Sequence, residues 1–198
     1  LTFDELHEHY DAVILSTGAD KDAPFTIPGA DLPEVYGGAD FVYWYDGHPD
    51  YPRTWTLEAE QVAVLGVGNV ALDIARMLAK RPEDLMSTDI PKNVEEGFRS
   101  SPITDVHVFG RRGPAQVKFT PMELRELGHL DDVDIIVYPE DFDYDEGSEK
   151  AMEASKMTRQ VVEQLTEWVF QEEEDLTASR RIHIHKLQAP TEILGDGK

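Results

Sequence analysis

Five short segments of the chain carry the apolar pattern of β-strands. Near-continuous apolar runs are typical of strands buried in a parallel sheet, and strict alternation of apolar and polar residues is typical of half-buried strands. Such segments fall at residues 12–15, 62–65, 105–109, 133–137 and 181–187.

Helical spacing of apolar residues appears between these runs. Val70, Ile74, Met77 and Leu78 recur at i, i+4, i+7 and i+8, which predicts a helix directly after the second run. Further helices are predicted at residues 1–9, 39–45, 81–104 (two short helices), 120–130 and 148–171.

Strands that alternate with helices along a chain form parallel sheets. We therefore predict an α/β fold, a Rossmann-like doubly wound parallel sheet with helices on both faces. A chain of 198 residues is long enough to form one good core with appended segments.

A glycine-rich turn joins the run at 62–65 to the helix that follows. Gly66 permits a tight turn, Gly68 lets the backbone approach a phosphate, and Ala71 keeps the helix close to its strand. The helix that begins near Asn69 directs unpaired N–H groups and a partial positive charge toward the same point. Such turns also occur without a ligand, so the flanking strand and helix are what make this one indicate a dinucleotide pyrophosphate site. The predicted contacts are Gly66, Val67, Gly68, Asn69 and Val70.

Two arginines follow the run at 105–109, where the second strand of a dinucleotide fold meets the adenosine ribose. NAD sites offer a carboxylate to the ribose 2′-hydroxyl there, whereas NADP sites offer cations to the 2′-phosphate. Arg111 and Arg112 therefore predict NADP, since a guanidinium binds phosphate through paired hydrogen bonds. Residues 81–104 account for the long path from Gly66 to this strand.

Composition narrows the class of protein. The sequence has no cysteine, which excludes disulfides, thiolate metal sites and redox-active thiol pairs. A net charge of −22 argues against nucleic acid or an anionic membrane as a partner, and no apolar run approaches the ~20 residues of a membrane helix. We expect a soluble, cytoplasmic protein, of an oligomeric state that the sequence does not specify. His183 and His185 share a strand face but lack a third nearby ligand, so no metal site is predicted.

Seven segments, in order along nearly the whole chain, resemble the adrenodoxin-reductase-like ferredoxin–NADP reductases. The block that contains GRRGP and ELRE is far more specific than the glycine turn. The segments are YDAVILSTGA (10–19), IPGADLPEVY (27–36), DFVYWYDGHP (40–49), GVGNVALDIAR (66–76), STDI (87–90), VFGRRGPAQVKFTPMELREL (108–127) and APTEILGDGK (189–198).

The resemblance implies a flavoprotein that moves electrons between NADPH and a ferredoxin through FAD. In that family the FAD domain is split around the NADP domain. We therefore expect residues 1–19 to be a crossover segment from an FAD domain outside the chain, residues 20–187 to be the NADP-binding domain, and residues 188–198 to return toward the FAD domain. By itself the chain is expected to bind NADP without catalysing flavin-linked electron transfer.

The resemblance also implies roles for three acidic residues. Glu123 matches a further NADP contact, and its position three residues after Thr120 also suits helix capping. Asp73 and Glu126 match acids near the nicotinamide and the flavin, which makes them candidate catalytic residues that orient the ring or relay protons. Both also suit solvated acids in early helix turns.

The chain departs from the family pattern at two positions. Val67 stands where Asn or Gln is usual, so a side-chain contact is lost while the backbone donors remain. Asp46 stands where the family's WYNG segment has Asn, which affects an amide contact to cofactor or partner.

Two other kinds of function stay open at this point. Another flavoprotein with two dinucleotide sites, such as a thioredoxin reductase or a flavin monooxygenase, would share the glycine turn. Thioredoxin reductase needs a redox cysteine pair that the sequence lacks. The second alternative is a non-catalytic NADP-binding module.

Overall fold

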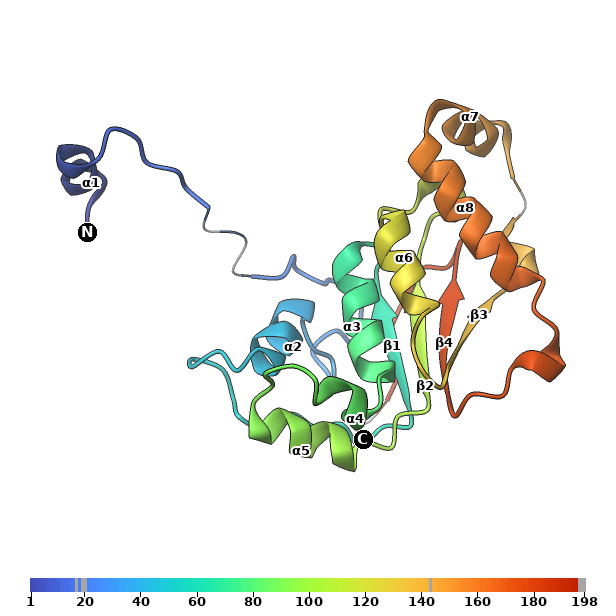
Figure 1. The fold of residues 1–198 in the computed structure, drawn as a ribbon, viewed down its shortest axis with the longest axis horizontal. Coiled ribbons are helices and arrows are strands. Elements are labelled where there is room, and N and C mark those ends of the chain that lie inside the picture. The colour runs from blue at the N-terminus through green and yellow to red at the C-terminus, as the bar shows by residue number, and fades with distance from the viewer. Residues whose placement is uncertain (17, 19–20, 143, 196–198) are drawn as a thin grey trace.

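The computed structural model describes residues 1–198 except for residues 17, 19–20, 143 and 196–198 (Figure 1). In the described residues, four parallel strands form a sheet in the order β1-β2-β4-β3. The strands are β1 (Gln61–Leu65), β2 (Asp105–Phe109), β3 (Val133–Val137) and β4 (Arg180–His185). The predicted Rossmann-like parallel α/β sheet is confirmed.

Three helices pack on one face of this sheet (Figure 1). Helix α3 (Asn69–Ala79) contacts β1, β2 and β4, α8 (Lys156–Val169) contacts β3, and α6 (Pro121–Leu127) packs against both α3 and α8. Every second side chain of the central strands is buried beneath them, as the alternation of a strand requires. These buried residues are Val106, Val108, Ile182 and Ile184.

A second group of helices lies beside α3. Helix α2 (Gly38–Tyr45) contacts α3, and α4 (Pro82–Leu85) contacts α5 (Lys92–Ser100). Their common core is aromatic, because the Trp44 ring centroid lies 5.7 Å from that of Phe98. The two short helices predicted within residues 81–104 are therefore present.

The long helix predicted over residues 148–171 is two helices, and this prediction is wrong in that respect. Helix α7 (Glu146–Ala154) ends where Ser155 adopts an extended backbone, and α8 begins at the next residue. The Ser155 side chain accepts a hydrogen bond from Thr158 N at 3.2 Å, so it caps α8. Serine favours such a cap over a helix interior because its hydroxyl competes for backbone groups.

The strand predicted at residues 12–15 is not formed. These residues belong to no helix or strand, and the side chain of Ile14 is 89% exposed. Helix α1 (Phe3–His9), which precedes them, buries no residue and lies apart from the sheet (Figure 1). An apolar run becomes a strand only where a neighbouring strand supplies hydrogen bonds, and this segment has none among the described residues. The predicted boundary at residues 19 and 20 lies outside the described residues, and the domain division stays a prediction.

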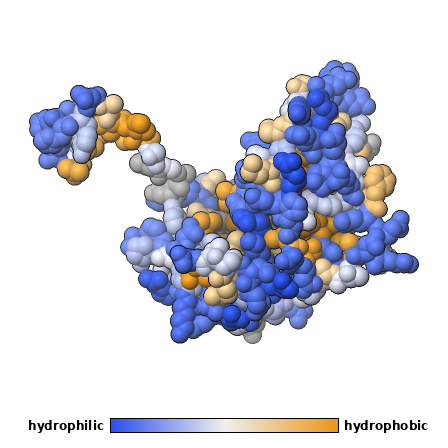
Figure 2. Space-filling model, viewed as in Figure 1, coloured by the Kyte–Doolittle hydropathy of each residue, from blue (hydrophilic) through white to orange (hydrophobic). Residues whose placement is uncertain are grey.

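Short 3₁₀ helices complete the fold: η1 (Pro114–Gln116), η2 (Pro139–Phe142) and η3 (Glu173–Asp175). The surface in the view of Figure 2 is mainly hydrophilic, in keeping with the acidic composition. Over the part of the chain that the structure describes, no helix combines the length and apolar character needed to cross a bilayer.

Candidate functional site

The glycine turn leaves the carboxyl end of β1 and leads directly into α3. Gly66 has a φ of 149°, a conformation that favours glycine, and its N–H donates to the Phe109 carbonyl at 3.0 Å. Gly68 is the N-cap of α3, and nothing lies within 4 Å of the position that a Cβ would take there. The space beside Gly68 is therefore open to a ligand.

The first turn of α3 presents backbone donors to this space. The N–H groups of Asn69 and Val70 have no acceptor among the described residues. The Asn69 side chain accepts from Thr120 N at 3.1 Å, which joins the start of α3 to the start of α6. Free N–H groups together with the helix dipole favour an anion at this point.

Val67 fastens the turn to two other loops. Its carbonyl accepts from Lys118 N at 3.1 Å. Its side chain packs so closely on Gly110 that a Cβ at Gly110 would overlap Val67 Cγ1. The apolar residue at position 67, which the sequence marked as a lost polar contact, therefore holds the turn against the loop that follows β2.

The predicted arginines lie in that loop. Arg111 and Arg112 are exposed, and neither forms an ion pair with a described carboxylate. The residues after β4 hold the loop in place, because Gly110 N donates to the His185 carbonyl at 2.9 Å and Gln188 N donates to the Gly110 carbonyl at 3.0 Å. The two guanidinium groups are thus free for an anionic ligand.

A cleft of about 490 Å³ joins the glycine turn to the arginines. Its volume falls in the range of small-molecule and cofactor sites. Sequence reasoning missed part of the lining, because those residues reach the cleft through tertiary packing alone. The missed residues are Phe25, Gln116, Lys118, Gln188, Ala189 and Pro190.

Glu123 lies on the first turn of α6 and is not among the residues that line the cleft. Thr120 is the N-cap of α6, but its side chain makes no capping hydrogen bond, so the capping box suggested by the sequence is not formed. Glu123 Oε2 is buried and has no hydrogen-bond partner among the described residues. A buried carboxylate oxygen without a donor is costly, which is consistent with a role toward a ligand.

The structure brings Asp73 and Glu126 together through Arg76. The Arg76 guanidinium lies 2.9 Å from Asp73 Oδ1 and 3.8 Å from Glu126 Oε2. Both carboxylates are about half exposed, whereas the Arg76 side chain is 26% exposed. The pair therefore forms a single charged group across α3 and α6, and its catalytic role stays a prediction.

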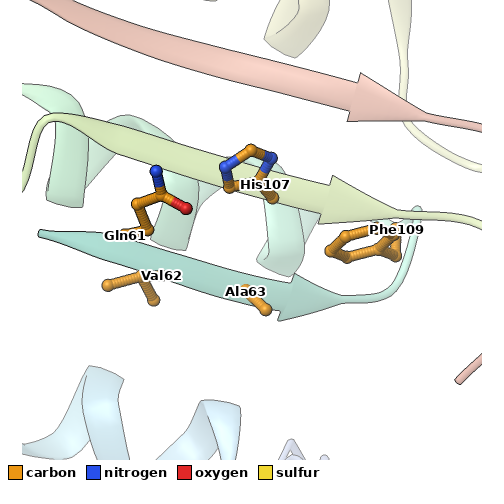
Figure 3. A pocket seen from close by; sticks show the side chains of 5 residues that line it. All are labelled: Gln61, Val62, Ala63, His107 and Phe109. Carbon is orange, nitrogen blue, oxygen red and sulfur yellow. The ribbon is translucent and has the colours of Figure 1, made fainter. Parts of the chain in front are cut away.

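A second, shallow hollow of about 300 Å³ lies on the face of the sheet that is opposite to α3, α6 and α8 (Figure 3). It contains no cation and no part of the glycine turn; its lining residues are Gln61, Val62, Ala63, His107 and Phe109. Imidazoles run across this face, with His107 Nδ1 3.0 Å from His185 Nε2 and His183 Nε2 2.9 Å from Asp105 Oδ1. Burial, with the nearby His107 and His183, lowers the pKa of His185 to about 4. In the described residues, no group of three or more His, Cys, Asp or Glu side chains is arranged to hold a metal ion.

The fold and the cleft define an α/β unit of the Rossmann type with a cleft beside its glycine turn. The chain is 42% identical over 197 residues to the NADPH-ferredoxin reductase FprA of Mycobacterium leprae. This match covers 98% of this chain and 42% of that protein. It is 36% identical over 168 residues to the mitochondrial NADPH:adrenodoxin oxidoreductase of Arabidopsis thaliana. That match covers 84% of this chain and 35% of the Arabidopsis protein. No protein-family model matches the chain.

A solved structure agrees with these relatives. Mycobacterium tuberculosis FprA in complex with NADPH has a TM-score of 0.88 and 39% identity, and the match covers 100% of this chain and 43% of that one. The resemblance to the adrenodoxin-reductase-like ferredoxin–NADP reductases is confirmed, and the chain is a homologue of part of these proteins. It spans less than half of their length.

Proposed function

We propose that the chain is the NADP(H)-binding part of a flavin-dependent ferredoxin–NADP reductase, with the FAD site lying mostly outside these 198 residues. When bound, NADPH would supply the hydride. The chain's own residues would bind and orient the cofactor. Relatives that are NADPH-dependent reductases of ferredoxin and adrenodoxin favour this function over a thioredoxin reductase, a flavin monooxygenase or a non-catalytic module.

One observation carries the proposal: a single cleft is lined by the glycine turn that begins α3 and by two arginines that form no ion pair with a carboxylate of the described residues. The amides at the start of α3 would receive the pyrophosphate. Arg111 and Arg112 would receive the 2′-phosphate, which distinguishes NADP from NAD. In a chain with a net charge of −22, a local basic site of this kind is needed to attract an anionic cofactor.

For the reacting end of the cofactor we assign Asp73 and Glu126. They lie on neighbouring helices and share Arg76, so the guanidinium would hold both carboxylates in a fixed orientation. Their task would be to orient the nicotinamide or to hold a proton. Glu123, with its unpartnered oxygen, would contribute a further cofactor contact.

Calorimetric titration of the chain with NADP⁺ and NAD⁺ tests the proposal. NADP⁺ is expected to bind more tightly than NAD⁺. A double variant, Arg111→Ala with Arg112→Ala, is expected to weaken NADP⁺ selectively, because each lost hydrogen bond to a charged group costs on the order of 1.5–3 kcal/mol. Arg99→Ala on α5 removes a cation that does not line the cleft and serves as the control. Equal affinity for both nucleotides, or binding of neither, would refute the function.

The partners and location of the parent protein are also proposals. A ferredoxin as electron carrier is supported by the relatives, while a cytoplasmic location awaits fractionation of cells that make the parent protein. An acidic carrier would be repelled on average by this chain's negative surface, so its docking would require a local basic patch or the FAD domain. Reduction of ferredoxin by NADPH with the parent flavoprotein tests the partner.

A further inference from the structure

Lys118 is a third cation in the cleft, and neither the glycine turn nor the diarginine loop contains it. It lies on the short segment between η1 and α6, and its side chain is exposed. It lines the same cleft as Arg111 and Arg112 and forms no ion pair with a carboxylate in the described part of the chain. Its ammonium is therefore available to an anion.

Two hydrogen bonds tie this segment to the glycine turn. Lys118 N donates to the Val67 carbonyl at 3.1 Å, and Thr120 N donates to Asn69 Oδ1 at 3.1 Å. Phe119, between these two anchors, is 2% exposed and belongs to the core. Because Phe119 is held inward and the backbone on both sides is anchored, Lys118 is presented to the cleft.

The anchors place the backbone of Lys118 beside the glycine turn. Val67 directly precedes Gly68, the N-cap of α3, so Lys118 is joined to the point where the helix terminus attracts an anion. Arg111 and Arg112 instead follow β2, at the ribose end. The backbone of Lys118 is thus bonded to the glycine turn itself, whereas the two arginines belong to the loop that follows β2.

We propose that Lys118 is a further cofactor-binding residue that contacts the pyrophosphate of the dinucleotide. It rests on the proposed function, since it assumes that a dinucleotide occupies the cleft. A lysine ammonium acts as a compact point charge and needs no bidentate geometry to bind a phosphate. The pyrophosphate is common to NADP and NAD, so Lys118 raises the affinity for both, whereas the arginines discriminate between them.

Titration of Lys118→Gln with NADP⁺ and NAD⁺ tests this assignment. The dissociation constants of both nucleotides are expected to rise by about three- to tenfold, as for an exposed charge contact. Their ratio is expected to stay within about twofold of the wild-type ratio. Lys118→Arg restores most of the affinity, because the charge is retained. Lys150→Gln, which removes an exposed lysine on α7 outside the cleft, leaves both constants unchanged.

The outcomes separate this assignment from the proposed function. Wild-type protein that fails to bind NADP⁺ defeats the proposed function itself. If wild type binds NADP⁺ but Lys118→Gln changes neither constant, or weakens NADP⁺ alone, the pyrophosphate assignment is overturned. If NAD⁺ binds too weakly to titrate, inorganic pyrophosphate and adenosine 2′-monophosphate replace the nucleotides, and loss of pyrophosphate affinity alone is the expected result. An unchanged urea midpoint for Lys118→Gln shows that the fold is intact.

Discussion

Lys186 directly follows β4 and is fully buried. Its Nζ atom has no hydrogen-bond partner among the described residues and lies 4.7 Å from the centroid of the Phe119 ring. Burial lowers the pKa of the Lys186 ammonium to about 7, and the nearby Asp141 only partly opposes this effect. Lys186→Met keeps an unbranched apolar side chain of similar size and removes the amine, so it isolates the cost of burying this group.

The size of the stability change expected for Lys186→Met follows from proton linkage. The unfolded chain has the ordinary lysine pKa of 10.5, so between pH 7 and that value it binds more protons than the folded chain. The free energy of unfolding therefore rises with pH across this window. At about 1.36 kcal/mol per pKa unit, the full difference corresponds to about 5 kcal/mol. Lys186→Met is thus expected to stabilise the protein by about 2–5 kcal/mol at pH 7.

Urea denaturation at pH 7, 8 and 9, followed by tryptophan fluorescence, measures this effect. The difference in the free energy of unfolding between Lys186→Met and wild type should shrink as the pH rises. At higher pH the lysine of the unfolded chain also loses its proton, so that burying the neutral amine costs less free energy. Lys150→Met on the surface of α7 is the control and is expected to change stability by less than about 0.5 kcal/mol at each pH. A Lys186→Met protein less stable than wild type at pH 7, or one with the same pH dependence, would refute the reasoning.

Three further predictions concern packing and caps. Leu165→Ala should lower the free energy of unfolding by about 2–5 kcal/mol in urea titrations, because this fully buried residue of α8 would leave a cavity. Ser155→Ala should cost about 1 kcal/mol, since the hydrogen bond to Thr158 N is lost, and Ser155→Thr should retain most of the stability. Gly110→Ala should weaken NADP⁺ binding and lower stability by about 1–3 kcal/mol through its overlap with Val67. Adding Val67→Ala should relieve part of that loss, and an additive double variant would contradict the packing argument.

The sequence predicted some elements correctly because their signals are local. The strands at 105–109 and 133–137 have the predicted bounds, since β-branched apolar runs bounded by turn residues suit a buried strand. The run of Val13, Ile14 and Leu15 has the same character but no pairing partner among the described residues, so it forms no strand. Strand order was not predictable, because it depends on which distant runs meet. Ile182 pairs with both Val106 and Ile135, which places β4 between β2 and β3.

Some residues of the candidate site could likewise be predicted from local sequence, and others could not. The glycine turn and the two arginines are contiguous motifs whose geometry follows from the strand that precedes them, so their place could be predicted. Lys118 and Phe25 carry no spacing rule that relates them to the turn. Lys118 reaches the cleft because its backbone bonds to Val67, and Phe25 because a loop before α2 comes to line the cleft. Likewise, only packing of α3 on α6 shows that Asp73 and Glu126 share Arg76.

By itself, the sequence determined that this chain builds a parallel α/β sheet, that a glycine turn opens the helix after β1, and that two arginines follow β2. These features depend on side-chain periodicity and backbone sterics within a few residues of each other. Tertiary structure alone decided that the sheet has the order β1-β2-β4-β3, that Val67 packs on Gly110, and that three cations share one cleft. The physical reason is that burial and hydrogen bonding between distant segments select one arrangement among many that the local pattern permits.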